Sequence, residues 1–164
     1  MSKKRVSYLI LGLVMMILGG ALFMIGISSV VGDTRITLDG SYYCNGMCDI
    51  GYLELETNEY EKLISEEKSF VVFVDQMGCD VADNLRKFTN DYFPPHGVKI
   101  YRMMFADVKD SSLHEKVKYY PSLVVVSKGK VKVFLRADSD EDAGAFNDYS
   151  EFEKWVEKYI FTEI

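Results

Sequence analysis

A short apolar run that leads directly into an amphipathic helix, with one cysteine at the junction, constrains the fold of this chain more than any other stretch. Residues 69–75 are rich in valine and phenylalanine, which is typical of a strand covered on both faces. After Cys79, apolar residues recur at intervals of three and four, which indicates one buried face of a helix. The sequence therefore predicts a buried strand, a break at Met77-Gly78, and a helix that begins at Cys79.

The predicted position of Cys79 gives its sulfur a particular environment. The first N–H groups of a helix have no partner inside the helix, and the positive end of the helix dipole lies there. Both effects favour a thiolate over a thiol, whereas the charge of Asp80 opposes them. Ala82 stands where a Cys-x-x-Cys motif has its second cysteine. Because a dithiol cycle needs a second thiol, Cys79 cannot complete one alone.

The N-terminal region has a different composition from the rest of the chain. Residues 1–5 form a basic head, and residues 6–31 carry no charge and are long enough to cross a hydrocarbon core of ~30 Å. A cleaved signal peptide is the alternative, but the apolar run is about twice the usual length and lacks a clear cleavage site. We expect a signal anchor that contacts the lipid bilayer through residues 6–31. The basic head predicts a cytoplasmic N-terminus and an extracytoplasmic C-terminal domain.

Charge is also distributed unevenly along the chain. All 25 acidic residues lie after Gly32, together with 16 of the 19 basic residues, so this part has a net charge of −9. Nucleic acid binding calls for a basic surface. We therefore expect no nucleic-acid partner.

Residues 32–50 are expected to tether the anchor to the domain. Asp39-Gly40 is compatible with the turn of a small β-ribbon. Three residues separate Cys44 from Cys48, which does not match a standard redox dithiol, and a zinc site would lack two ligands. In an oxidising compartment we expect a local structural disulfide between these two cysteines. Free or partner-directed thiols are the alternative.

Residues 51–164 alternate between strand and helix patterns. Besides the run described above, strand patterns lie at residues 52–56, at 98–106, and in a hairpin at 122–135. Three further helices are predicted where a polar residue precedes a glutamate by three positions, at Asn58, Ser112 and Ser150. The predicted order is βαβαβαββα. Asp138, Asp140 and Asp142 alternate as in a calcium loop, but the rest of that pattern fails, and neither a metal site nor a cofactor is expected.

This order, with a cysteine after the second strand and a proline before the fourth, resembles the thioredoxin-like superfamily. The matching pieces are FVVFVDQMGCDVA (70–82) and KYYPSLVVVSKGKV (118–131). The resemblance implies an α/β three-layer sandwich and a cis bond between Tyr120 and Pro121. It also implies that this bond packs beside Cys79 and that the backbone of Tyr120 binds an extended segment of a partner. Met77 and Gly78 complete the expected partner-binding surface.

The chain departs from that family at several positions. The usual Trp-Cys-Gly-Pro-Cys motif becomes Gly78-Cys79-Asp80-Val81-Ala82, and Phe73 stands where the family has a buried acid. Three functions stay open on these residues. Cys79 can form mixed disulfides with an exported thiol-containing protein, resolved by an external thiol or by the cysteines of residues 32–50. Alternatively, the domain is a non-catalytic interaction module with a buried Cys79, or an accessory subunit of a membrane complex for export or envelope assembly.

Overall fold

A computed structural model describes residues 35–49 and 51–162 of the 164-residue chain. The predicted basic head and membrane anchor lie outside the described residues. Within the described ranges, no helix is long and apolar enough to cross a membrane. The chain from Arg35 onward forms one compact unit.

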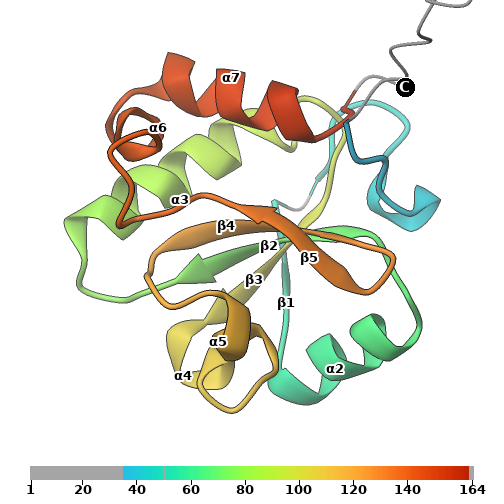
Figure 1. Cartoon of the computed structure of the whole chain (residues 1–164). Coiled ribbons are helices and arrows are strands. Elements are labelled where there is room, and N and C mark those ends of the chain that lie inside the picture. Colours follow the sequence, from blue (N-terminus) through green and yellow to red (C-terminus); the bar gives the residue numbers. More distant parts are fainter. Residues whose placement is uncertain (1–34, 50, 163–164) are drawn as a thin grey trace, which may run out of the picture. The chain divides into compact units, whose positions relative to one another are not determined.

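Five strands form one mixed sheet with the order β1-β3-β2-β4-β5 (Figure 1). The first three in this order run parallel: β1 (Tyr52–Glu54), β3 (Ile100–Met104) and β2 (Phe70–Asp75). The other two are β4 (Ser122–Ser127), antiparallel to β2, and β5 (Lys130–Phe134), antiparallel to β4. The described domain therefore has the mixed α/β architecture that the sequence predicts.

Helices cover both faces of the sheet and make a three-layer arrangement (Figure 1). On one face lie α2 (Thr57–Ser65), α4 (Phe105–Val108) and α5 (Leu113–Lys116). On the other face lie α3 (Asp80–Tyr92), α6 (Ala143–Asn147) and α7 (Tyr149–Tyr159). Because helices pack on both sides of the central strand, all six residues of β2 are buried, as the apolar run predicts. Phe73 is fully buried and its ring stacks on Tyr52, so an aromatic contact occupies the position of the family's buried acid.

Several helices begin at other residues than the sequence predicts. The last helix begins at Tyr149 and not at Ser150, because the Asp148 side chain accepts a hydrogen bond from the Glu151 N–H at 3.0 Å. Helix α2 likewise begins before Asn58. The acidic segment after residue 136, in which no helix was predicted, leads into α6, whose Phe146 is buried.

The third strand is shorter than predicted and leads into a helical turn. The predicted strand extended to Ala106, but β3 ends at Met104 and α4 begins at Phe105. The Phe105 ring packs against the Tyr120 ring, with centroids 4.9 Å apart. This turn therefore supports the loop that precedes β4.

The segment before β1 packs on the domain from Arg35 onward. A short 3-10 helix, η1 (Gly40–Tyr42), stands where a β-ribbon was considered. Leu38 and Tyr42 are buried, and the Tyr42 ring meets the Tyr101 ring at 5.6 Å between centroids. Ile36 forms a parallel bridge with Ile160, next to the end of α7. Residues 35–49 are thus packed against the domain as part of it.

Candidate functional site

The turn between β2 and α3 presents Cys79 at the start of the helix. Cys79 is the N-cap residue of α3, and its carbonyl oxygen accepts hydrogen bonds from the N–H groups of Ala82 at 2.9 Å and Asp83 at 3.1 Å. Gly78 has φ +75°, a left-handed conformation that residues with a side chain rarely adopt. This glycine completes the reversal between strand and helix. The side chain of Met77 is 80 % exposed.

Cys79 is a free and partly exposed cysteine. Its side chain makes no capping hydrogen bond, so the sulfur is not hydrogen-bonded to the backbone of the helix. Asp80 and Asp83 lie in the first turn of the same helix. Cys79 is therefore located at the N-terminus of a helix whose first turn is acidic.

The loop before β4 lies at the same edge of the sheet as Cys79. The Tyr120–Pro121 peptide bond is cis, as the resemblance implies. In the antiparallel pairing of β2 with β4, Val74 stands opposite Ser122. The preceding Pro121 is therefore adjacent to the end of β2, where the turn to Cys79 begins.

Tyr120 is held by its own surroundings. Its hydroxyl donates to the Val117 carbonyl, and Nδ1 of His114 lies 3.3 Å from the same hydroxyl. Burial raises the pKa of Tyr120 to about 12. The neighbouring Tyr119 is 55 % exposed. The loop thus has a fixed tyrosine next to the cis bond and an exposed tyrosine beside it.

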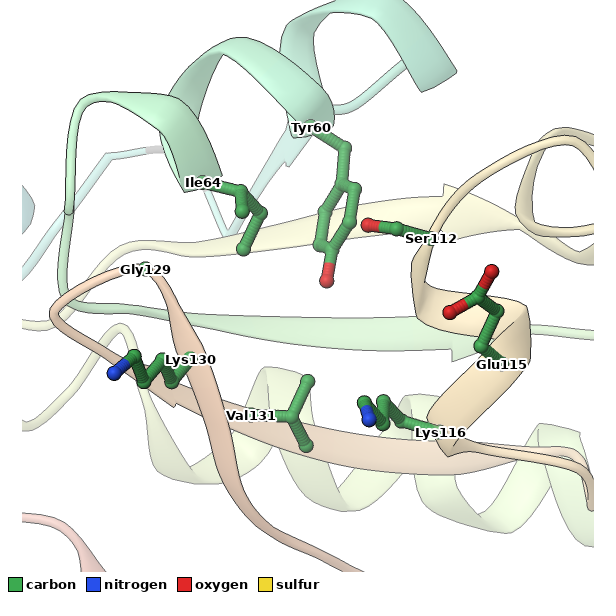
Figure 2. A pocket seen from close by; sticks show the side chains of 8 residues that line it. All are labelled: Tyr60, Ile64, Ser112, Glu115, Lys116, Gly129, Lys130 and Val131. Atoms are coloured by element: carbon green, nitrogen blue, oxygen red, sulfur yellow. The ribbon is translucent and has the colours of Figure 1, made fainter.

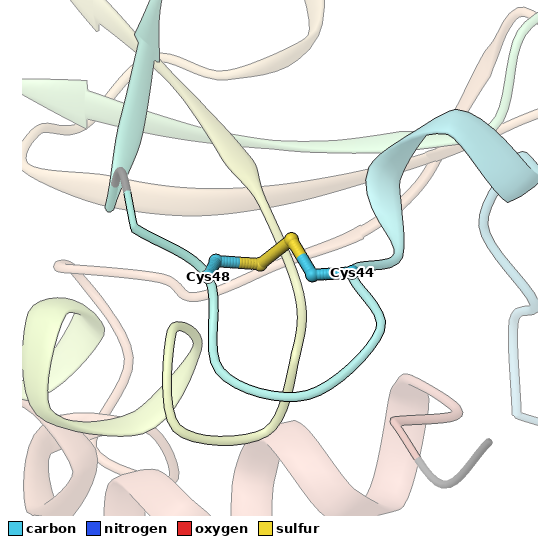
Figure 3. The surroundings of a disulfide bond; sticks show 2 residues. All are labelled: Cys44 and Cys48. Carbon is cyan, nitrogen blue, oxygen red and sulfur yellow. A yellow bond between two sulfur atoms is a disulfide. The ribbon is translucent and has the colours of Figure 1, made fainter.

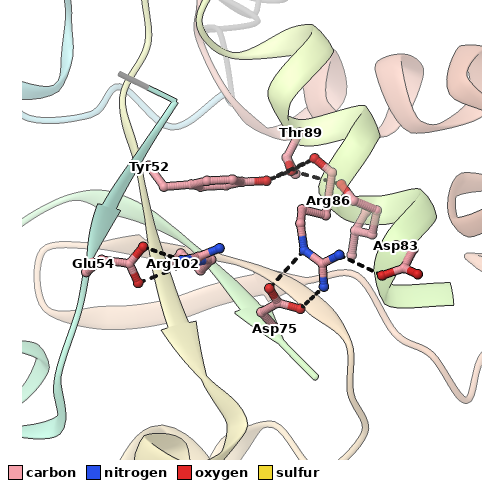
Figure 4. Close-up of polar contacts among 8 residues, drawn as sticks. Tyr52, Glu54, Asp75, Asp83, Arg86, Thr89 and Arg102 are labelled. Carbon is pink, nitrogen blue, oxygen red and sulfur yellow. Dashed lines mark hydrogen bonds and ion pairs between the residues drawn. The ribbon is translucent and has the colours of Figure 1, made fainter. Parts of the chain in front are cut away.

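An ion pair between the partly exposed Arg86 and the buried Asp75 joins the end of β2 to α3 (Figure 4). Nε of Arg86 lies 3.0 Å from Oδ2 of Asp75, and Nη2 lies 2.7 Å from Oδ1. Nη1 of Arg86 also lies 2.6 Å from Oδ1 of Asp83. Hydrogen bonds to Asp75 and then to Asp83 raise the pKa of Arg86 above its ordinary value. Our sequence analysis did not identify this pair, and its only sequence signal is an acid at the end of an apolar strand.

A pocket of about 490 Å³ adjoins this pair and the Cys79 turn. Its lining residues come from β2, β3, α3 and the turn: Asp75, Met77, Gly78, Asp83, Arg86, Arg102 and Met104. Arg102 forms a second ion pair across the sheet, with Nη2 2.5 Å from Oε1 of Glu54 (Figure 4). Both arginine charges in the pocket are thus balanced by carboxylates.

Another pocket, of about 430 Å³, lies between α2, α5 and the β4–β5 hairpin (Figure 2). The Tyr60 hydroxyl points into it, and burial raises the pKa of that phenol. Lys116 and Lys130 lie at its border (Figure 2). The residues that line this pocket include no cysteine and none of the residues of the turn or the cis-proline loop.

Cys44 and Cys48 form a disulfide, with their Cα atoms 5.6 Å apart (Figure 3). Cys44 N–H donates to the Gly97 carbonyl at 2.7 Å, and Cys48 N–H donates to the Pro94 carbonyl at 2.9 Å. The disulfide loop therefore lies on the segment that follows α3. A helix of 13 residues is about 20 Å long, so this loop and Cys79 are at opposite ends of α3.

The structure thus separates the predicted site residues into two groups. Met77, Gly78 and Cys79 share one sheet edge with Tyr120 and Pro121. The disulfide cysteines are at the other end of α3. Within the described ranges, no cluster of three or more histidine, cysteine or acidic side chains is arranged to hold a metal ion.

No protein-family model matches the chain, and no curated protein matches it. Three similar solved structures are thioredoxins or a thioredoxin-like protein. Trxlp from Edwardsiella tarda is 12 % identical, covers 63 % of this chain and 96 % of its own, and has a TM-score of 0.47. Mitochondrial thioredoxin 3 from Saccharomyces cerevisiae in its oxidized form is 14 % identical, with coverages of 65 % and 93 % and a TM-score of 0.46. A thioredoxin mutant from Halobacterium salinarum is 15 % identical, with coverages of 73 % and 98 % and a TM-score of 0.48.

Proposed function

We propose that this chain is a membrane-anchored, extracytoplasmic thioredoxin-like protein that engages partner thiols through a mixed disulfide at Cys79. The observation that carries the proposal is the placement of a free, partly exposed cysteine at the N-cap of α3, at the same sheet edge as the cis Tyr120–Pro121 bond. The membrane anchor is proposed from the uncharged run at residues 6–31 and the basic head before it.

The proposed reaction is a single thiol–disulfide exchange. The Cys79 thiolate attacks one sulfur of a partner disulfide, the partner S–S bond breaks, and a bond between Cys79 and the partner forms. The second partner sulfur leaves as a thiolate, so no outside oxidant is needed. Release of free Cys79 requires another thiolate, which attacks the partner's sulfur in the mixed disulfide, so that the S–S bond breaks and Cys79 leaves as a thiolate.

We propose that this second thiol is either another cysteine of the partner or a separate, external thiol compound. Ala82 carries none, and Cys44 and Cys48 are bonded to each other at the far end of α3. The protein would therefore hold or exchange a partner without completing a dithiol cycle alone. An exported thiol-containing protein or a cysteine-bearing subunit of a membrane complex fits this chemistry when two of its cysteines are joined in a disulfide that Cys79 can attack.

A non-catalytic interaction module of an export or envelope complex is the second candidate. The exposed side chains of Met77 (80 %) and Tyr119 (55 %) favour it, because they stand next to the two partner-facing segments and offer apolar contact area. In this case the partner binds the same edge without a covalent bond, and Cys79 is dispensable.

Alkylation of Cys79 in the folded protein tests the thiol proposal. The full-length chain is used without reductant, so that the disulfide leaves Cys79 as the reactive thiol, and Cys79→Ser measures background labelling. We expect Cys79 to be alkylated in the folded protein and to form a trapped adduct with a peptide disulfide probe. Labelling that occurs only after unfolding would reject the thiol proposal in favour of the interaction module.

A further inference from the structure

The turn that presents Cys79 receives little support from its own side chains. Met77 is 80 % exposed, and a Cβ atom added at Gly78 would meet nothing within 4 Å. The turn is therefore positioned mainly by the two elements at its ends. What fixes β2 relative to α3 also determines where the Cys79 sulfur lies.

The Asp75–Arg86 pair makes that connection. Asp75 is the last residue of β2 and is 2 % exposed, and Arg86 lies in the second turn of α3. Both oxygens of the carboxylate accept hydrogen bonds from the guanidinium, a bidentate geometry that restrains orientation as well as distance. A compact ring thus runs from β2 through the turn, along α3 and back to β2 through this pair.

The same pair is located next to the cis-proline loop. The register that places Val74 opposite Ser122 brings Asp75 level with Pro121. Arg86 therefore ties α3 to the point of the sheet from which the Tyr120–Pro121 loop also extends. A mixed disulfide with an extended peptide requires the cysteine and this loop to act on the same segment. A misplacement of about 1 Å can slow a reaction of this type by roughly 100-fold.

We propose that Asp75 and Arg86 are positioning residues, which hold Cys79 in register with the cis-proline loop for exchange with an extended partner segment. This inference depends on the proposed function for its role in exchange. The restraint of the turn by this ion pair does not depend on the proposed function and can be measured separately.

The Arg102–Glu54 pair provides a matched control. Arg102 and Arg86 have similar side-chain exposures, 31 % and 30 %, and both line the same pocket. However, Arg102 joins β3 to β1 and makes no bond to α3. Arg102→Gln therefore removes an arginine from the same pocket and leaves the connection between β2 and α3 in place. Asp83→Asn is a second control, because it removes only the negative charge that pairs with Arg86 within the same helix and leaves the Asp75–Arg86 pair intact.

The experiment compares Arg86→Gln, Arg86→Lys, Arg102→Gln and Asp83→Asn in the full-length chain, using two thiol reagents. Iodoacetamide is small and reports exposure of the sulfur. A peptide disulfide probe must also reach the cis-proline loop. We expect Arg86→Gln to slow mixed-disulfide formation at least 10-fold while the alkylation rate changes less than 3-fold, with Arg86→Lys intermediate. Both controls should keep wild-type rates with both reagents.

Hydrogen exchange provides a readout that does not require Cys79 to react with a partner. The amides of Ala82 and Asp83 are bonded to the Cys79 carbonyl, so their exchange reports the restraint of the turn. In Arg86→Lys, which retains the charge, these two amides should exchange at least 10-fold faster than in Arg102→Gln, while the amides of β2 remain unchanged. Unchanged exchange at Ala82 and Asp83 would overturn the inference. If the wild-type protein does not react with the peptide disulfide probe, the proposed function is wrong. The exchange rates of the Ala82 and Asp83 amides would still show whether Arg86 restrains the turn.

Discussion

The two ends of α3 carry cysteines in opposite chemical situations. At the N-terminal end, Cys79 is free, partly exposed and next to an exposed methionine. At the C-terminal end, Cys44 and Cys48 are bonded to each other, and the loop that they close is hydrogen-bonded to the backbone of the segment after the helix. One end is open to a partner, and the other is closed by its own chain.

The difference shows that the backbone environment assigns the role of each cysteine. The disulfide loop is pinned by two main-chain hydrogen bonds, and Cys48 is 5 % exposed, so this site stabilises the packing of the preceding segment. The Cys79 turn has a left-handed glycine and free space around it. Each of the following predictions tests this contrast between an open and a closed cysteine site.

The largest expected effect follows from Cys79→Ser. Because the remaining cysteines are paired with each other, this change should abolish mixed-disulfide formation with a peptide disulfide, a loss of more than about 100-fold, while the free energy of unfolding changes by less than about 1 kcal/mol. Non-reducing electrophoresis and urea unfolding provide the two measurements. Adduct formation that persists in Cys79→Ser would place the reactive thiol at the other end of α3.

The second largest effect is expected when the disulfide at the other end of α3 is removed. Replacement of both Cys44 and Cys48 by alanine should lower the free energy of unfolding by about 2 kcal/mol, because the bond closes a very short loop in the unfolded chain. The alkylation rate of Cys79 should stay within about 2-fold of wild type, since the sites are separated by the length of α3. Urea unfolding and iodoacetamide kinetics on the same samples check both expectations. A large change in Cys79 reactivity would mean that the two sites are coupled.

Two glycines with positive φ sharpen the contrast. Gly97, with φ +68°, lies beneath the disulfide loop, and an added Cβ would approach the Gly46 carbonyl oxygen to 2.8 Å. Gly78, with φ +75°, has no neighbour at that position. We expect Gly97→Ala to cost about 2 kcal/mol, from backbone strain and a backbone clash, and Gly78→Ala about 1 kcal/mol, from strain alone. Equal losses in urea unfolding would contradict the idea that only the disulfide edge is closely packed.

The smallest effect concerns Tyr120 beside the cis bond. Burial raises the pKa of its phenol from 10.0 to about 12, so the folded state favours the neutral form. This contribution to stability is fully present below pH 10 and is lost as the pH rises towards about 12. The free energy of unfolding should therefore fall less steeply between these pH values in Tyr120→Phe than in the wild type. The exposed Tyr119, changed to phenylalanine, is the matched control and should retain the wild-type slope.

The sequence was sufficient for features that depend on local pattern. Valine and phenylalanine in residues 69–75 predicted β2, and the apolar spacing after Cys79 predicted the start of α3. The two cysteines separated by three residues predicted a local disulfide, because their closeness along the chain limits how far apart they can be. The resemblance to thioredoxin-like proteins supplied the three-layer arrangement and the cis bond before β4, whereas the order of the strands in the sheet was not predicted.

Only the tertiary structure decided which distant residues meet. The Tyr149 ring at the start of α7 meets Phe88 of α3, a contact between residues 61 positions apart. The packing of residues 35–49 against the sheet and the end of α7 joins residues more than a hundred positions apart, as in the Ile36–Ile160 bridge. The Asp75–Arg86 pair likewise forms only when α3 folds back along the sheet. Periodicity determines which face of an element is apolar, whereas such contacts depend on the order of the strands and on which helix covers them.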